Sequence, residues 1–201
     1  MAKKKKNSSK GSLKKALLIG LLILLGITGF SAYEFYSLVY KSNIGFTEND
    51  KYFYIPTGSE FKDVSNALNA QNIIRNQASF DWLSQQKNYV LNVKAGRYLL
   101  HRGMSNNELI NLLRSGEQEP VSVTFNNIRF KEELAGKVAT FIEADSTSII
   151  NLLNSDSFVS DYGFTNATFL TLFLPNTYEF WWNTSAEEFV ARMAKEYKHF
   201  W

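Results

Sequence analysis

The sequence contains no cysteine and only two histidines among its 201 residues. Without cysteine the chain can form neither disulfide bonds nor thiolate metal sites, and its cysteine usage indicates no redox compartment. His101 and His199 are far apart and lack the spacing of paired metal ligands, so no metal site is predicted. The chain also lacks a phosphate-binding glycine loop, a nucleophile elbow and a Walker motif. The enzyme classes that these motifs define are therefore not indicated.

Acidic residues are missing from the N-terminal end. Residues 1–15 contain seven lysines and no acid, whereas the rest of the chain has 15 basic residues against 19 acidic ones. The basic character therefore belongs to a tail and not to a nucleic-acid-binding face, and no nucleic-acid partner is predicted. Residues 1–12 are too polar to bury a core, so we expect them to be disordered.

An uncharged apolar run follows the lysines at residues 16–33. Eighteen residues that each rise ~1.5 Å give about 27 Å, close to the ~30 Å hydrocarbon core of a bilayer. Tyr33, Phe35 and Tyr36 follow, as in an interfacial aromatic belt. We predict a transmembrane helix at 16–36, with the basic tail at 1–15 in the cytoplasm by the positive-inside rule and the rest outside.

A cleaved signal peptide is the alternative interpretation of this run, and it would release a small secreted glycan-binding domain. The run is longer than the usual apolar region of a signal peptide, and no clear A-x-A cleavage site follows it. The sequence therefore favours the uncleaved anchor.

The remaining pattern indicates an α+β protein in which helices cover strands. Residues 37–50 are predicted to be a linker. Residues 51–117 are predicted to form a strand, two helices, an extended stretch and a third helix. The strand is predicted at 51–56, and residues 57–59 turn into the first helix, whose buried face includes Phe61, Val64, Ala67 and Leu68. The second helix is predicted at about 79–86 and the extended stretch at 90–100. The third helix has a capping box at Ser105 and Glu108 and a C-cap at Gly116.

The region 118–201 repeats the alternation. We predict a strand at Val121–Phe125 and a helix at 129–139, with Phe130, Leu134 and Val138 on one side. A second helix is predicted at Ser146–Asn154. Residues 157–167 are predicted to be a loop and residues 169–174 a buried strand. Ser185 and Glu188 form a capping box that opens the last helix.

The stretch LTLFLPNTYEFWWNTSAEEF at 170–189 holds the densest chemistry in the chain. Asn176 and Thr177 are predicted to form a turn after Pro175. Flat aromatic rings beside polar groups suit a sugar, whose ring has apolar faces and polar edges. The alternative is an ordinary buried aromatic core. The aromatic residues concerned are Phe173, Tyr178, Phe180, Trp181 and Trp182.

Two strings in the chain resemble one family. PNTYEF at 175–180 and KAGRYLLHRGMSNNELINLLRSG at 94–116 are similar to the YceG-like family of endolytic murein transglycosylases, and the resemblance covers roughly residues 50–201. It implies a LysM-like subdomain at 51–117 and the N-terminal part of a transglycosylase domain at 118–201. A further stretch of that domain is expected beyond residue 201, so we expect the chain to be a fragment.

The resemblance also implies a function. Members of the family cut nascent peptidoglycan strands between N-acetylmuramic acid and N-acetylglucosamine and leave 1,6-anhydro ends. The chain would act at the bacterial inner membrane, with its main domain on the periplasmic side, close to cell-wall synthases and without a metal or cofactor. The alternative is a non-catalytic, membrane-anchored peptidoglycan-binding or scaffold protein on the same fold.

Candidate site residues follow from both arguments. The family pattern places its catalytic glutamate at the position of Leu170, and leucine cannot transfer a proton. Glu179 is the only acid within the aromatic cluster, so it is the candidate acid, unless it points outward into solvent or the acid lies beyond residue 201.

The polar residues of the same region are the candidate substrate contacts. Asn176, Thr177 and Tyr178 match the family motif and would line a glycan groove, or else form a capped turn. Asn126, with Asn127, offers amides to sugar hydroxyls, or else simply makes a turn.

Overall fold

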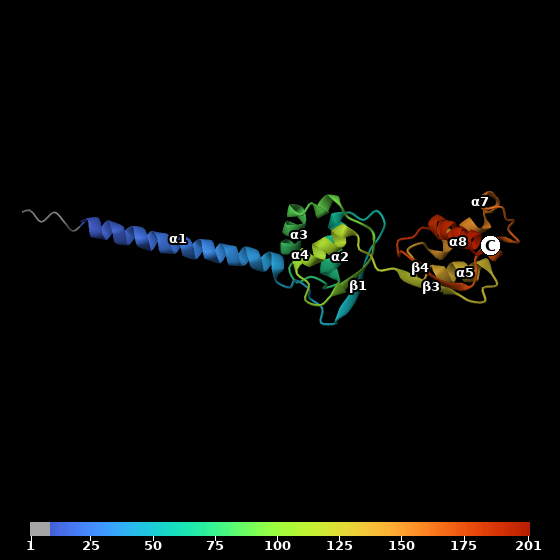
Figure 1. Cartoon of the computed structure of the whole chain (residues 1–201), viewed down its shortest axis with the longest axis horizontal. Helices are drawn as coiled ribbons and strands as arrows, with labels where there is room; N and C mark the ends of the chain where they lie inside the picture. Colours follow the sequence, from blue (N-terminus) through green and yellow to red (C-terminus); the bar gives the residue numbers. More distant parts are fainter. Residues whose placement is uncertain (1–8) are drawn as a thin grey trace, which may run out of the picture.

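The computed structural model describes residues 9–201, so the first eight residues of the predicted basic tail lie outside the described residues. A long N-terminal helix extends from two compact units that follow one another along the same direction (Figure 1). The mixture of helices and short antiparallel strands confirms the α+β class.

The helix α1 (Ser9–Tyr40) is continuous. Its segment Leu17–Tyr40 has 24 residues and a mean hydropathy of 1.9, which is long and apolar enough to cross a membrane. The apolar side chains of residues 17–36 are exposed, whereas Leu38 and Val39 at the end of the helix pack against the first unit. The helix therefore includes the predicted span at 16–36 and continues beyond it.

The first unit is built on the antiparallel pair β1 (Asp50–Ile55) and β2 (Gly96–His101), in register from Asp50↔His101 to Ile55↔Gly96. Helices α2 (Phe61–Ala70), α3 (Gln77–Gln86) and α4 (Asn106–Ser115) complete it, in the predicted order. The 3-10 turn η1 (Tyr89–Leu91) replaces the start of the predicted extended stretch at 90–100. The hydrophobic core of the unit includes Phe53, Leu68, Phe80, Tyr98 and Leu109.

The segment 37–50 is not a free linker, which corrects the prediction for these residues. Residues 37–40 are the last turn of α1, and Val39, Ile44 and Phe46 are buried in the core of the first unit. Ile44 also forms an antiparallel bridge with Ile74. The apolar residues in this short stretch find partners that are distant in sequence, and a local reading cannot identify those partners.

The second unit is built on the antiparallel pair β3 (Val121–Phe125) and β4 (Asn176–Phe180). Helices α5 (Lys131–Val138), α6 (Ser146–Asn154), α7 (Asp156–Asp161) and α8 (Ala186–Phe200) surround a second core that shares no residue with the first. The predicted loop at 157–167 contains most of α7, which begins at a Ser155 cap. Phe130 was predicted to share one side of the helix at 129–139 with Leu134 and Val138, but it precedes α5 and is 66% exposed, whereas the other two are buried.

The stretch before β4 is also different from the prediction. Residues 169–174 do not form a strand: Phe169–Leu172 is the 3-10 turn η2, which buries Phe169 and Leu172. The strand begins after Pro175, and Asn176 and Thr177 belong to it and not to a turn. Proline has no amide hydrogen to give to a ladder, so the chain joins β3 only beyond it.

The two units meet through a few polar and aromatic contacts. The amide of Glu119 donates to the carbonyl of Arg97 at 2.9 Å, next to the connection between the units. The rings of Tyr54 and Trp182 meet edge to face, 5.0 Å apart. The end of the β1 strand therefore packs against the segment that follows β4.

Candidate functional site

Strand β4 separates the aromatic cluster of the sequence into two faces. Tyr178 and Phe180 point into the core, whereas Thr177 and Glu179 point outward, as the period of two requires. Glu179 lies opposite Ser122 of β3 on this outer face. Phe173 and Phe189 stack in the core with ring centroids 5.6 Å apart. Much of the predicted cluster is therefore core, which is the alternative that the sequence left open.

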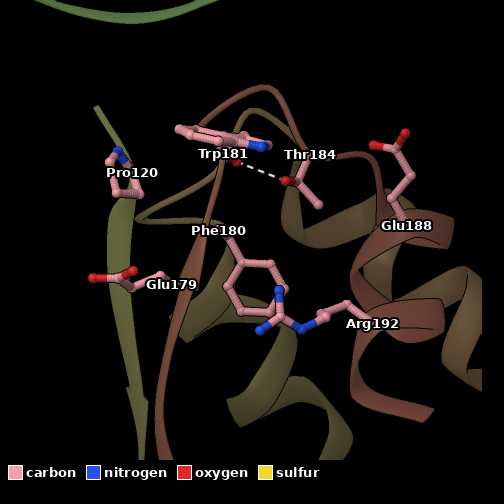
Figure 2. Close-up of a pocket in the computed structure, with 7 residues that line it drawn as sticks. All are labelled: Pro120, Glu179, Phe180, Trp181, Thr184, Glu188 and Arg192. Atoms are coloured by element: carbon pink, nitrogen blue, oxygen red, sulfur yellow. Dashed lines mark hydrogen bonds between the residues drawn. The ribbon is translucent and has the colours of Figure 1, made fainter. Parts of the chain in front are cut away.

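A cleft of about 490 Å³ opens at the end of β4 (Figure 2). Pro120, just before β3, forms one side of the cleft. The end of β4 with the following turn and the outer side of α8 form the others. Its floor and walls combine aromatic rings with carboxylates, a hydroxyl and one guanidinium. The residues that line it are Pro120, Glu179, Phe180, Trp181, Thr184, Glu188 and Arg192.

Trp181 offers the cleft an aromatic surface. The side chain is 52% exposed, although its neighbours Phe180 and Trp182 are buried or half-buried. The hydroxyl of Thr184 donates to the carbonyl of Trp181 at 2.6 Å and closes the turn between β4 and α8 (Figure 2). The turn therefore holds the indole at the edge of the cleft.

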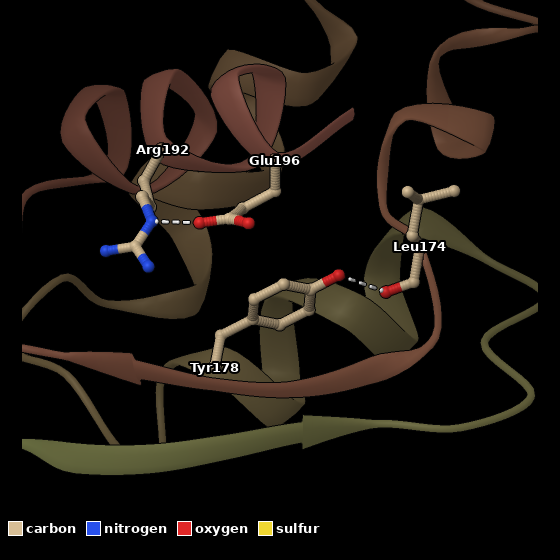
Figure 3. A network of polar contacts seen from close by, with 4 residues as sticks. All are labelled: Leu174, Tyr178, Arg192 and Glu196. Atoms are coloured by element: carbon tan, nitrogen blue, oxygen red, sulfur yellow. Dashed lines mark hydrogen bonds and ion pairs between the residues drawn. The ribbon is translucent and has the colours of Figure 1, made fainter. Parts of the chain in front are cut away.

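Charged groups reach the cleft from α8. Glu188 closes the capping box of the helix, because its Oε2 accepts from the amide of Ser185 at 3.0 Å. One turn later Arg192 points towards Phe180, and its Nε donates to Oε1 of Glu196 at 2.7 Å (Figures 2 and 3). This bond engages only Nε. The two Nη groups of the guanidinium are not used in it.

Tyr178 is held inside the second unit. Its hydroxyl donates to the carbonyl of Leu174 at 2.9 Å, and its side chain is only 7% exposed (Figure 3). Burial raises the pKa of Tyr178, the negative charge of Glu196 raises it further, and Arg192 opposes them. The phenol therefore stays protonated at neutral pH and bridges β4 to the loop before it.

The other predicted contacts lie away from the cleft. Asn176 and Thr177 are exposed in the first part of β4, about 14 and 10 Å from Phe180 at ~3.4 Å per residue. The hydroxyls of Thr177 and Thr124 lie 2.8 Å apart, and Oδ1 of Asn176 accepts from the amide of Thr177. Asn126 is exposed in the loop after β3, where Asn127 has a positive φ of 55°. Thr177 shares the outer face of β4 with Glu179, about 7 Å away along the strand, but Asn126, Asn176 and Thr177 do not line the cleft.

Leu170 lines a second, smaller cavity of about 110 Å³. It shares this cavity with the loop after β3 and with the residues that flank η2. The position at which the resemblance places a glutamate is therefore at the Asn176 end of β4 and not in the larger cleft. The other residues around this cavity are Phe125, Asn127, Ile128, Phe173 and Pro175.

The sequence interpretation did not single out Arg192. The signal was present, because Glu188, Arg192 and Glu196 follow one another at intervals of four and share one face of a helix. Whether that face meets a cleft depends on how α8 packs, which the spacing does not determine. Within residues 9–201, no three histidine, aspartate or glutamate side chains come close enough to hold a metal ion.

A comparison with models of known protein families identifies the family of this chain. The model of the YceG-like family matches residues 53–201, which is most of the chain. The chain belongs to the YceG-like family. The match begins within β1 and includes most of the first unit, the second unit and the cleft, and it confirms the resemblance found in the sequence.

This YceG-like chain was also compared with individual proteins and with solved structures. A comparison with curated proteins gives no match. Among solved structures, the chain is similar to a YceG-like protein from Listeria monocytogenes, with 20% identity and a TM-score of 0.41. The similarity covers 76% of this chain and 55% of the other, so the chain corresponds to about half the length of that protein.

Proposed function

We propose that this chain is part of a membrane-anchored endolytic peptidoglycan transglycosylase. The observation that carries the proposal is the family match over residues 53–201. The apolar helix α1 supports the anchoring, with the lysine-rich end in the cytoplasm and both units on the periplasmic side of the inner membrane. An anchored enzyme of this kind would act on glycan strands as membrane-bound synthases make them.

The first unit would serve as the LysM-like subdomain of such an enzyme. Its β-α-α-β order and antiparallel strand pair support this assignment. In the same proposal the second unit is the N-terminal part of the catalytic domain, and the cleft beside Trp181 binds the glycan strand.

The cleft has the chemistry that a glycan needs. The exposed indole of Trp181 can stack on the apolar face of a sugar ring, as aromatic side chains do at wet binding sites. The Nη groups of Arg192 can bind a carboxylate or carbonyl oxygen of a muramic acid substituent. The carboxylates of Glu179 and Glu188 can accept hydrogen bonds from sugar hydroxyls.

The reaction requires one acid that also acts as a base. A carboxylic acid protonates the oxygen between the two sugars as the bond to C1 of the muramic acid breaks. The resulting carboxylate then takes the proton of the C6 hydroxyl, and the C6 oxygen bonds to C1 and closes the 1,6-anhydro ring. Glu179 is our candidate for this group, because Glu188 is engaged in the helix cap.

The test is to incubate the chain with uncrosslinked glycan strands and to count 1,6-anhydromuramic ends by mass spectrometry. Glu179→Gln tests the acid, and Glu187→Gln is the control, since Glu187 is exposed on α8 but does not line the cleft. Loss of product only in Glu179→Gln would assign the acid. Product that persists in this variant would place the acid elsewhere.

A non-catalytic peptidoglycan-binding or scaffold protein is the second candidate. The observation in its favour is Leu170, an apolar residue at the position where the family pattern has a glutamate. A chain that binds glycan strands and yields no anhydro ends in the same assay would support the binding protein and contradict the enzyme.

A further inference from the structure

An exposed tryptophan of the first unit lies beside the anchor helix. Trp82, on α3, is 38% exposed. Its ring meets the ring of Phe35 edge to face, with centroids 5.8 Å apart. Phe35 lies on α1 just two residues after the uncharged run at 16–33 ends. If that run spans the hydrocarbon core, Trp82 is at the level of the lipid headgroups.

The first unit cannot swing freely at this point, because a buried polar network joins it to α1. The side-chain amide of Asn106 donates to the carbonyl of Leu38, at the end of α1, and to Oγ of Ser79 on α3, at 3.0 and 2.9 Å. Its Oδ1 accepts from Nδ2 of Asn43 at 2.8 Å. The network fixes α3 and α4 against the last turn of α1.

A second group of bonds reinforces this joint. Oδ1 of Asn43 accepts from the amide of Asn76, the N-cap of α3, at 2.8 Å, and Nδ2 donates to the carbonyl of the same residue. Val39 packs in the core of the unit. The end of the anchor helix and the start of α3 therefore form one rigid piece, and the height of Trp82 relative to α1 is set by the fold.

The exposed side of α3 suits a lipid surface. Ala78, Trp82, Gln85 and Gln86 are exposed and uncharged. Asp81, the one acid of the helix, is turned away and accepts from the hydroxyl of Ser65 at 2.5 Å. Arg75 precedes the helix and Lys87 follows it, so both ends carry a positive charge that anionic headgroups attract.

We propose that α3 lies on the membrane surface, with Trp82 inserted among the lipid headgroups as a second point of attachment beside α1. Tryptophan is the side chain most suited to this depth, because its ring is apolar and its N–H finds polar partners there. Figure 1 shows α3 next to the end of α1 and the second unit on the far side of the first. The cleft is thereby held away from the bilayer by the thickness of the first unit. The inference rests on the proposed membrane anchoring.

The experiment uses the full chain in phosphatidylcholine vesicles whose acyl chains carry bromine close to the headgroup, which quenches nearby indoles. One variant retains Trp82 alone, with Phe at 181, 182 and 201, and a second retains Trp181 alone. A third has Leu25→Trp and Phe at the four natural positions, and it reports insertion of α1 in matching vesicles whose acyl chains carry bromine near their ends, because position 25 is at the middle of the run at 16–33. We expect quenching of Trp82 by about half, as for an interfacial tryptophan, and none of Trp181.

The outcomes separate the inference from the anchoring. Quenching of the tryptophan at position 25 without quenching of Trp82 would overturn the inference and leave the anchor intact. Absence of quenching at both positions would overturn the anchoring and the inference with it.

A milder pair of variants keeps three natural tryptophans, in case the multiple substitutions unfold the chain. Trp82→Phe should remove the lipid-quenchable part of the total fluorescence, and Trp181→Phe should leave it in place. An equal quenchable part in both variants would overturn the proposal.

Discussion

Glu143 accepts two hydrogen bonds from Thr57, one from the backbone amide at 2.7 Å and one from the hydroxyl at 2.5 Å. Thr57 follows β1 in the first unit, and Glu143 lies between α5 and α6 in the second. The amide of Glu143 also donates to the carbonyl of Trp182, whose ring meets Tyr54. One carboxylate therefore joins the two units at the point where their aromatic rings meet.

Removal of this carboxylate should loosen the arrangement of the units. The connection near residue 118 would then be the main restraint, since the remaining contacts are few. We expect Glu143→Ala to broaden the distance distribution between spin labels at positions 62 and 132, measured by electron paramagnetic resonance. The chain has no natural cysteine, so the labels react only with the two cysteines introduced at these positions.

The control is Asp161→Ala, which removes an exposed acid on α7. It should leave the distribution as it is in the wild type. Equal distributions in all three proteins would show that the bond does not hold the units.

Local sequence rules were enough for much of the fold. β3 and α6 have the predicted bounds, and both predicted capping boxes are present, at Ser105 with Glu108 and at Ser185 with Glu188. Gly116 has the positive φ of 74° expected of a helix C-cap. These features depend on residues within one or two turns of each other, so they can be read without knowing the tertiary structure.

The errors have a common cause, which is that the deciding partner is distant in sequence. Val39 and Ile44 are buried by residues of α3, α4 and the stretch before α3, so a short apolar segment looked like a linker. The apolar run at 169–174 fits a strand or a helical turn equally well, and packing selects the turn.

The candidate site was found only in part for the same reason. Of the residues that line the cleft, the sequence located Glu179, Phe180 and Trp181. It placed Asn176 and Thr177 in the same groove, although these first residues of β4 do not line the cleft at its other end. Arg192 enters the cleft only because α8 returns alongside β4.

Loss of the Asn106 amide should destabilise the first unit. Asn106→Ala would leave Leu38 without its donor and Asn43 without its acceptor, in a site that is 1% exposed. Buried groups without partners cost ~1–3 kcal/mol each, so we expect the free energy of unfolding to fall by about 2–3 kcal/mol. Urea denaturation of the full chain in detergent measures this change. Asn69→Ala, on the exposed side of α2, should change it little, and a similar small effect of Asn106→Ala would contradict the network.

Glu108 should make the first unit sensitive to acid. Hydrogen bonds from the amide and hydroxyl of Ser105 lower the pKa of Glu108, while partial burial opposes them. A carboxyl group whose folded-state pKa is lowered contributes stability above its unfolded pKa of ~4.3, and this contribution is lost as the pH falls through the folded-state pKa. Glu108→Gln should therefore lower the urea midpoint at pH 7 and match the wild type well below pH ~4.

The comparison for this prediction is Glu117→Gln, which changes an exposed acid just beyond α4. Its urea midpoint should follow that of the wild type at both pH values. A difference between wild type and Glu108→Gln that stays constant down to the acid limit would show that the capping box does not depend on the charge.

Trp181 should contribute to glycan affinity without contributing to the fold. Its ring is largely exposed at the edge of the cleft, so Trp181→Ala removes a stacking surface and little core. We expect Trp181→Ala to lose ~1.4 kcal/mol of binding free energy for soluble glycan strands. This loss corresponds to about a tenfold larger dissociation constant, which calorimetry measures. Trp201→Ala removes an exposed tryptophan that does not line the cleft and is the matched control. Equal affinities for the two variants would remove the cleft from the proposal.

Tyr178 should stabilise the second unit and should not contact the glycan, although its sequence motif suggested a contact. Its hydroxyl is already bonded to the carbonyl of Leu174, and the side chain is buried. Tyr178→Phe removes one buried hydrogen bond, so we expect a loss of about 1 kcal/mol in the free energy of unfolding and an unchanged glycan affinity. Tyr162→Phe is the matched control, because no described residue is hydrogen-bonded to the hydroxyl of Tyr162 in the structure, and its stability should change less. A weaker glycan affinity in Tyr178→Phe with full stability would instead place this phenol in the binding surface, as the motif first indicated.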